Sequence, residues 1–299
     1  MSGQGEPVVR SESVARRGEQ SQVAAAQARS SPPKKYLSIF RIRFINALQY
    51  RAAALAGVST QFAWGFMELF AFRAFYQANP AAFPMEFSQT VCYVWLQQAF
   101  LTLFMMWYWE NDIITEITEG AIAYQMVRPV DIYNRWFCQS AANRLARALL
   151  RCIPLFMVVF FLPEPYRMSL PPSFGQFLLF VLSAALSLSV VVAFSSLVYV
   201  SLFYTLSPTG TRLMASGISD FLAGGLLPLP FFPAPIRAVV ELLPFASMQN
   251  MPLRIYSGHI AGIDALSGIG LQVFWLLVLV LIGRLALNKA LKRVIVQGG

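Results

Sequence analysis

The sequence predicts an all-α integral membrane protein with six transmembrane helices, and three observations lead to this fold class. First, 57% of the 299 residues are hydrophobic and 12% are charged, which is about half the charged share of a soluble domain and too little to cover one soluble core. Second, several apolar runs are long enough to cross a bilayer. Third, the basic residues are distributed as an alternating membrane topology requires.

The spans set the boundaries of the predicted transmembrane domain, residues 52–290. With the N-terminus in the cytoplasm, all but four of the 23 Lys and Arg residues fall on the cytoplasmic side, where basic residues are enriched in membrane proteins. This predicts a multi-pass protein of the cell (inner) membrane with both termini cytoplasmic. The six spans are expected near 52–75, 88–109, 143–162, 174–203, 212–228 and 268–288.

The segments outside the spans are polar or amphipathic. Residues 1–33 are rich in Ser, Gln, Ala and Arg and contain no apolar core of a signal peptide, which predicts a disordered cytoplasmic tail. Residues 291–299 are expected to be a short cytoplasmic C-terminal tail. Residues 34–51 predict an amphipathic helix in the membrane interface, although they could also begin the first span. Its apolar face would consist of Leu37, Phe40, Phe44 and Leu48.

The connection between the second and third spans combines charges with aromatic residues, in the stretch EGAIAYQMVRPVDIYNRWF, residues 119–137. Asp131, just after Pro129, is a good N-cap for the next helix. Acidic residues lead up to the first residue of the stretch, and three arginines follow the stretch on one helical face. Arginine at membrane depth costs a few kcal/mol, so the two groups are expected to pair. The acidic group is Glu110, Asp112, Glu116 and Glu119, and the basic group is Arg144, Arg147 and Arg151.

Such pairing would hold residues 119–128 as a rigid helix parallel to the membrane surface. Its apolar side chains would then face the cytosol uncovered, and exposed apolar patches usually mark an interface. The stretch is therefore expected to bind a partner, whereas the simpler alternative is a well-braced loop without one. The exposed set would be Ile122, Tyr124, Met126 and Val127.

The connection between the fifth and sixth spans, residues 222–258, is too apolar for a free loop and too often interrupted by proline for a span. It predicts a hairpin that re-enters the outer half of the membrane, with its backbone groups satisfied by surrounding protein.

Over residues 36–290 the sequence resembles a known family, the ABC-2-type exporter permeases. Within that family it is similar to the subgroup described as ABC-2 family transporter protein. The outer connection carries the likeness at Gly225, Pro228, Leu229, Phe232, Pro233, Leu243, Pro244, Phe245, Pro252 and Gly258. The inner connection carries it at Gly120, Ile122, Ala123, Arg128, Pro129 and Val130.

The resemblance implies roles for these segments. The amphipathic N-terminal helix would be the family's elbow helix. The inner helix would be a coupling helix that docks on a separate ABC ATPase subunit, through Gly120, Ile122, Tyr124, Met126, Arg128, Pro129 and Asp131. The outer hairpin would be an extracellular gate formed by Pro228, Phe232, Pro233, Pro244 and Phe245.

The same resemblance implies partners. The permease would work as a dimer, with a second copy of itself or a paralogous permease, together with two ATPase copies and the lipid bilayer. The chain contains no GxxxxGK[ST] loop, so ATP and Mg would be held by the partner subunit and no cofactor by this chain. The basic residues lie beside apolar runs, which argues against nucleic acid as a partner.

Catalysis and metal binding are not expected. The single histidine, His259, excludes multi-histidine sites, and Cys92, Cys138 and Cys152 form no CxxC pair. Glu68 and Asp220 lie in predicted spans, where an ionisable group either lines a cavity or holds helices together. An alternative function is therefore an ATP-independent secondary transporter or channel that uses Glu68 and Asp220.

Overall fold

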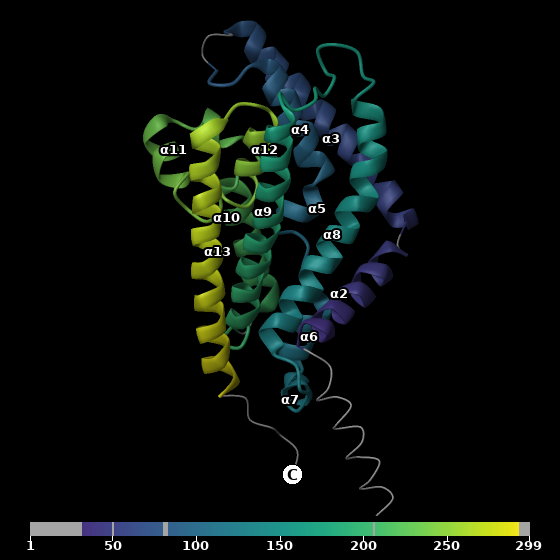
Figure 1. Ribbon diagram of the computed structural model, residues 1–299, viewed down its shortest axis with the longest axis vertical. Coiled ribbons are helices and arrows are strands. Elements are labelled where there is room, and N and C mark those ends of the chain that lie inside the picture. Colours follow the sequence, from purple (N-terminus) through teal and green to yellow (C-terminus); the bar gives the residue numbers. More distant parts are fainter. Residues whose placement is uncertain (1–31, 50, 80–82, 206, 293–299) are drawn as a thin grey trace, which may run out of the picture.

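The structure, a computed structural model, describes residues 32–49, 51–79, 83–205 and 207–292. All regular elements in these ranges are helices, which agrees with the predicted all-α class (Figure 1). They are α2 (Pro32–Leu48), α3 (Arg51–Ala78), α4 (Phe87–Ala99), α5 (Leu101–Phe104), α6 (Asn111–Thr118), α7 (Ile122–Met126), α8 (Ile132–Val159), α9 (Phe174–Ser201), α10 (Pro208–Leu222), η2 (Leu229–Phe231), α11 (Ala234–Val240), α12 (Asn250–Tyr256) and α13 (Gly262–Leu291).

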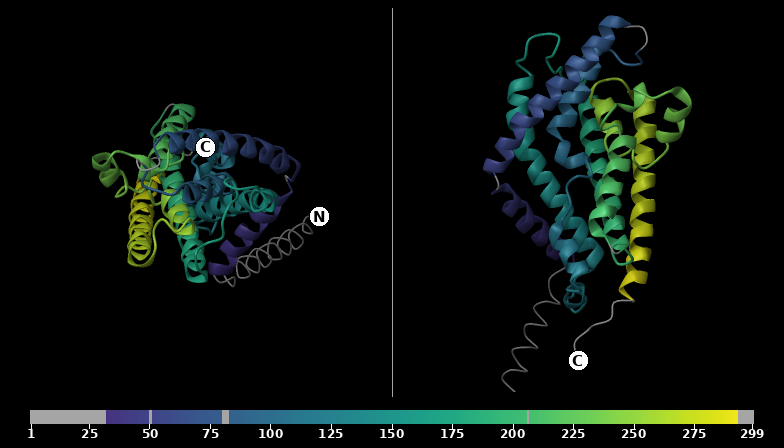
Figure 2. Two further views of the ribbon diagram at one scale, coloured as in Figure 1. Left: turned by 90° about the horizontal axis from the view of Figure 1, so that it is seen from above. Right: turned by 180° about the vertical axis from the view of Figure 1, so that it is seen from behind.

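The long helices α3, α8, α9 and α13 extend along the long axis of the molecule (Figures 1 and 2). The short helices α6 and α7 form one end, where α2 begins and α13 ends. The α8–α9 connection and α11 lie toward the opposite end. The described chain therefore starts and finishes at the α7 end. The predicted tails, 1–33 and 291–299, fall almost entirely outside the described residues.

Two helices of the described part are long and apolar enough to cross a membrane by length and composition alone. They are α9, with 28 residues, and α13, with 30 residues. These helices correspond to the fourth and sixth predicted spans. The first predicted span corresponds to α3, which carries Glu68 and Arg73 within its sequence. Membrane crossing by α3, α4–α5, α8 and α10 stays a prediction.

The second and fifth predicted spans differ from the observed helices. Helix α4 ends at Ala99 and α5 ends at Phe104, after which the chain is not helical until α6, so a continuous helix over 88–109 was wrong. Helix α10 ends at Leu222 instead of continuing to residue 228. It stops because Gly224 follows with φ of +84°, a left-handed conformation that glycine adopts without steric cost.

Arg144 stabilises the break after α5. A helix end leaves carbonyl groups without partners, and the guanidinium of Arg144 donates to three of them, at 2.7 to 3.3 Å. The side chain is 2% exposed. Pairing of Arg144 with the acidic residues, expected from the sequence, was therefore wrong, because main-chain carbonyls take their place. The three acceptors are the carbonyl oxygens of Thr102, Met105 and Tyr108.

The helix predicted over 34–51 is observed as α2, which packs against α8, and its place in the membrane interface stays a prediction. Phe40, Phe44 and Leu48 are half-buried, as expected for the apolar face, but Leu37 is 67% exposed. The Asp131 cap of α8 is confirmed, since its carboxylate accepts a hydrogen bond from the amide of Asn134 at 2.8 Å. The hydroxyl of Tyr36 also accepts from the amide of Asp131 at 3.2 Å, which ties the start of α2 to the start of α8.

Buried glutamines join the C-terminal half. The amide nitrogen of Gln272 in α13 donates to the carbonyl of Ser247 at 3.1 Å and to the hydroxyl of Ser187 in α9 at 2.9 Å. The amide nitrogen of Gln176 in α9 donates to the carbonyls of Ile255 and Ile260, both at 2.8 Å. Because buried polar groups must be satisfied, these bonds fix the segment 247–260 against α9 and α13.

Candidate functional site

The α7 surface, defined by Tyr124, Met126 and Val127, is an exposed apolar patch at one end of the molecule. The three side chains are 76%, 46% and 84% exposed. Figure 1 places α7 at one end of the molecule, level with the end of α13. The predicted exposure of these three side chains is confirmed within the described residues, whereas their role in docking stays a prediction.

Glycine and proline set the two ends of α7. The chain reverses between α6 and α7 at Gly120, whose φ is +73°, a conformation that favours glycine. Pro129 cannot continue a helix, and Asp131 starts α8. Helix α7 is therefore a single short helix between two fixed corners. The longer rigid helix predicted over 119–128 is not observed.

Ile122 does not belong to the exposed patch. It is 1% exposed and packs in a cluster with Ile113, Ile117 and Trp136. Its predicted exposure was wrong, because α6 folds back over it. Ile122 instead anchors α7 to α6 and α8. The other residues expected at this site, Gly120, Arg128, Pro129 and Asp131, are exposed.

A charged pair joins the helices around α7. The guanidinium of Arg135 in α8 donates two hydrogen bonds to the carboxylate of Glu116 in α6, one of them at 3.0 Å. The amide nitrogen of Gln125 in α7 donates to the same carboxylate at 3.3 Å. A bidentate arginine–carboxylate pair has a fixed geometry. Glu116 therefore connects α6, α7 and α8 at one point.

The other predicted charge pairs differ. Asp112 pairs with Arg43 of α2 at 2.8 Å, and Glu110 accepts from the amide nitrogen of Asn143 at 2.7 Å. Arg151 donates to the hydroxyl of Tyr108 at 2.9 Å. The acidic residues therefore bind partners on α2 and the first half of α8. Pairing with Arg144, Arg147 and Arg151 was wrong, since those residues contact the irregular chain after α5.

A cavity of about 260 Å³ lies beside the α7 surface, between α7 and the last turns of α13. Met126 and Gln125 line one side, and Arg284 and Leu287 line the other. A side chain from a partner that covers α7 could enter this cavity. The geometry thus extends the candidate contact area from α7 to the end of α13.

A polar chain links the two predicted cavity residues. The amide nitrogens of Gln97 and Gln98 in α4 donate to the carboxylate of Glu68 at 3.3 Å each. Gln97 also donates to the carbonyl of Gly225 at 2.8 Å, and the amide of Gly225 donates to the carbonyl of Asp220 at 2.8 Å.

This chain of bonds ends at the main-chain carbonyl of Asp220 and does not reach its carboxylate. The sequence analysis missed Gln97 and Gln98, although two adjacent amides in an apolar run are a usable signal. The carboxylate of Asp220 accepts from the amide of Met106 at 3.1 Å, next to the break after α5. Glu68 does not pair with Arg73, whose guanidinium donates to the hydroxyl of Tyr166.

The sequence profile of the family described as ABC-2 family transporter protein matches residues 62–298 of this chain. The matched range contains α7, the break after α5 and the whole segment from α9 to α13. This chain belongs to the ABC-2 transporter family. Curated proteins and solved structures gave no match.

The permease is a membrane-embedded protein. It belongs to a transport family whose members typically work with an ATP-binding subunit. Among its described residues, no three His, Cys, Asp or Glu side chains lie close enough together to hold a metal ion. Of its three free cysteines, Cys92 and Cys152 are buried and Cys138 is half-buried.

The hairpin between α10 and α13 contains the five predicted gate residues of this permease, and they differ in exposure. Pro228, Phe232 and Pro244 are buried, Phe245 is half-buried and Pro233 is exposed. Sequence reasoning therefore selected mainly residues that hold the hairpin's shape. The apolar side chains on its surface, which composition alone did not distinguish, are Leu226, Ile236, Val239 and Leu242.

Hydrogen bonds and an ion pair hold the hairpin to α4 and to itself. The carbonyl of Gly224 accepts from the hydroxyl of Tyr93 in α4 and from the amide nitrogen of Gln249, both at 3.2 Å. Arg254 of α12 pairs with Glu241 at 2.6 Å across the hairpin. A side chain at residue 224 would collide with Tyr93, since a Cβ there lies 2.7 Å from the hydroxyl oxygen.

Proposed function

We propose that this chain is the membrane-spanning permease subunit of an ATP-driven exporter. It forms the translocation path through six spans and pairs with a second permease, either another copy of itself or a paralogue. ATP and Mg are held by a separate ABC ATPase subunit, expected in two copies. Both termini lie in the cytoplasm of a cell whose inner membrane holds the complex.

The single observation that carries this proposal is the α7 surface. Tyr124 and Met126 are apolar side chains that the described chain leaves uncovered at the tip of a braced helix. An exposed apolar patch costs free energy until a partner covers it. A cytoplasmic ATPase with an apolar groove supplies that cover, and the cavity beside α13 can receive one of its side chains.

The bracing of α7 supports a mechanical role. Glu116 bonds to Arg135 and Gln125, and Ile122 is buried between α6 and α8. A push on α7 therefore moves the base of α8 as one body. Helix α8 is 28 residues long, about 42 Å at 1.5 Å per residue, so it can carry the displacement to the opposite end of the molecule.

The positions of α2 and the hairpin support the proposed topology. Helix α2 begins and α13 ends at the α7 end (Figure 2), as expected if the described chain crosses the membrane an even number of times. Helix α2 packs on α8 as an elbow helix would. The hairpin surface of Leu226, Val239 and Leu242 would then form the extracellular gate.

Co-purification with the ATPase tests this function. Tyr124→Glu combined with Met126→Glu places two charges where the partner's apolar groove is expected, so the ATPase should be lost while the permease stays folded. The matched control is Thr205→Glu combined with Thr209→Glu. These two exposed residues lie in the α9–α10 connection and the first turn of α10, where acidic side chains are tolerated well.

The outcomes separate the proposals. Loss of the ATPase from the α7 variant alone supports coupling through α7, whereas equal retention by both variants contradicts it. Transport that continues in vesicles without ATP, and stops when the proton gradient is collapsed, would instead favour a secondary transporter that uses Glu68 and Asp220.

A further inference from the structure

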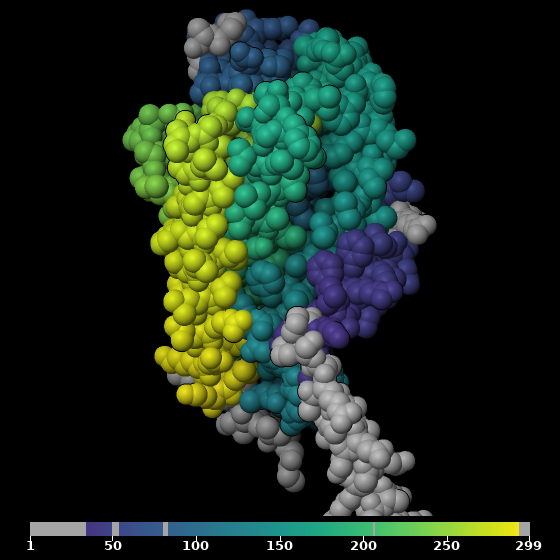
Figure 3. All heavy atoms as spheres, in the orientation of Figure 1, coloured from purple at the N-terminus to yellow at the C-terminus, as the bar shows by residue number. Residues whose placement is uncertain are grey.

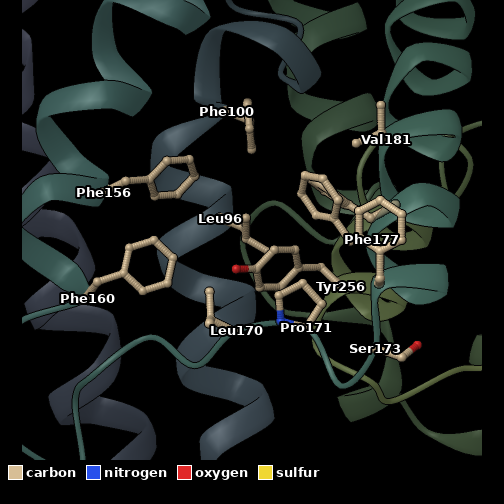
Figure 4. A pocket seen from close by; sticks show the side chains of 12 residues that line it. Leu96, Phe100, Phe156, Phe160, Leu170, Pro171, Ser173, Phe177, Val181 and Tyr256 are labelled. Carbon is tan, nitrogen blue, oxygen red and sulfur yellow. The ribbon is translucent and has the colours of Figure 1, made fainter.

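A cavity of about 610 Å³ lies between α4, α8 and α9, at the end of the molecule away from α7. Its walls are aromatic and aliphatic, and their rings face one another across the open space (Figure 4). Six of the lining residues are Leu96, Phe100, Phe156, Phe160, Phe177 and Val181. This volume falls within the range of sites that bind drug-sized molecules, about 300–1,000 Å³.

One polar group is directed into this cavity. Tyr256 at the end of α12 is 6% exposed, and its hydroxyl points into the open space (Figure 4). That hydroxyl has no hydrogen-bond partner within the part of the chain that the structure describes. The other hydroxyl of the lining, on Ser173, already accepts a hydrogen bond from the amide of Gln176 at 3.1 Å. The Tyr256 hydroxyl is thus free to donate to a molecule in the cavity, so the cavity is suited to an apolar ligand with one acceptor.

The cavity opens to the side of the molecule. Phe177 and Val181, on the face of α9 that lines it, are 39% and 47% exposed. In Figure 3 the surface between the columns of α8 and α9 is hollowed, with darker blue atoms of the α4–α5 region behind them. Helix α9 is one of the two helices long and apolar enough to cross a membrane. An opening on its flank faces lipid chains and not water.

The cavity wall is held in place by the α8–α9 connection. The indole nitrogen of Trp95 donates to the carbonyl of Tyr166 at 2.9 Å, and the amide of Met168 donates to the carbonyl of Val159 at 3.1 Å. Leu170 and Pro171 of the same connection line the cavity. A preformed site lowers the ordering cost of binding.

We propose that this cavity binds one acyl chain of a phospholipid, with the ester carbonyl of that chain accepting a hydrogen bond from the hydroxyl of Tyr256. Tyrosine is enriched at the depth where ester groups lie, because its ring is apolar and its hydroxyl is polar. The rings of Phe156 and Phe177 contact the chain from both sides. The site does not depend on ATP coupling, and it holds whether or not α7 docks on an ATPase.

Photo-crosslinking locates the lipid. The permease is placed in nanodiscs containing a phospholipid with a diazirine on its acyl chain, irradiated and mapped by mass spectrometry. Crosslinks are expected on α8 and α9 residues of the cavity. Val181→Trp fills the opening and should reduce them at least fivefold, while crosslinks on the exposed face of α13 stay unchanged. That face includes Leu277, Leu281 and Leu285.

The matched control is Val273→Trp, which makes the same substitution at a 40% exposed position of α13. It should leave the cavity crosslinks intact. Cavity crosslinks that Val181→Trp does not reduce, or that Val273→Trp reduces equally, would overturn the proposal.

A second measurement tests the hydroxyl. Native mass spectrometry compares the retention of an ester-linked phospholipid with that of its ether-linked analogue, which lacks the carbonyl. Tyr256→Phe should weaken binding of the ester lipid about fivefold, the effect of one hydrogen bond of about 1 kcal/mol, and leave the ether lipid unchanged. If the variant binds the two lipids in the same ratio as the unaltered protein, the proposal fails.

Discussion

Arg144 illustrates how one buried charge holds an irregular chain. Its guanidinium bonds to the carbonyls of Thr102, Met105 and Tyr108. Replacement by Met leaves these carbonyls unsatisfied, at about 1–3 kcal/mol for each buried group. Arg144→Met should therefore lower the thermal unfolding temperature of the detergent-purified protein by several degrees.

Arg147 provides the control for this prediction, because it lies one turn further along α8 and donates no hydrogen bond to a carbonyl of the described residues. Its guanidinium carbon lies 5.8 Å from the ring centre of Tyr108. Arg147→Met should change the unfolding temperature much less. Equal effects of the two substitutions would show that Arg144 does not support the break after α5.

His259, in the α12–α13 connection, makes the stability of that connection depend on pH. Burial, with the positive charges of Arg254 and Arg237, lowers the pKa of His259 from 6.5 to about 4. Between these values the unfolded chain binds a proton that the folded chain does not, so stability is complete above pH 6.5 and decreases as the pH falls toward 4.

His259→Gln removes this titration. Unfolding temperatures measured from pH 7.5 to pH 4.5 should fall less steeply for the variant than for the unaltered protein. Carboxylates elsewhere contribute equally to both curves, so two parallel curves would contradict the role of His259.

At the scale of elements, the pair of Glu116 and Arg135 determines how firmly α7 is held. Both side chains are largely buried, at 17% and 13% exposed, and removal of one partner leaves the other charge uncompensated. Glu116→Gln should accelerate amide hydrogen exchange in residues 121–127 by on the order of tenfold, which corresponds to about 1.4 kcal/mol.

Asp112→Asn is the comparison, since it breaks a mostly exposed pair with Arg43. Exposed pairs contribute about 0–1 kcal/mol, so exchange in 121–127 should stay unchanged. If Glu116→Gln accelerates exchange no more than Asp112→Asn does, the pair of Glu116 and Arg135 does not hold α7.

The approach of α13 to α8 depends on Gly283. A Cβ at this position would lie 2.8 Å from Cε2 of Tyr133, and that ring is buried against the guanidinium of Arg284. Gly270, in the same helix, has nothing within 4 Å of a Cβ. Gly283→Ala should therefore lower the unfolding temperature, and Gly270→Ala should keep or raise it, because alanine favours a helix over glycine by about 1 kcal/mol. If both substitutions change the unfolding temperature in the same direction, this close packing is contradicted.

At the scale of the whole molecule, local signals were predicted well from the sequence. The Asp131 cap and the corners at Gly120 and Pro129 follow from residues a few positions apart. The exposure of Tyr124 and Met126 was also predictable, because no neighbouring segment could cover them.

Long-range packing was not predictable in the same way. The burial of Ile122 depends on α6 folding back, and no proline or glycine marks the break between Ala99 and Glu110. Without knowledge of that break, the three main-chain carbonyls that bind Arg144 could not be predicted. The gate residues were chosen by motif, whereas their burial is decided by how the hairpin folds on itself.

The central claim is that work done by a separate ATPase reaches this permease through α7. The most direct measurement replaces Tyr124 by the photoreactive residue benzoylphenylalanine in the complete complex in native membranes; Tyr124 is 76% exposed, so the position has room for the larger aromatic side chain. Irradiation should give one adduct between the permease and an ATP-binding polypeptide, and the same residue at position 209 should give none. Absence of an adduct from position 124, or equal adducts from both positions, would contradict the claim.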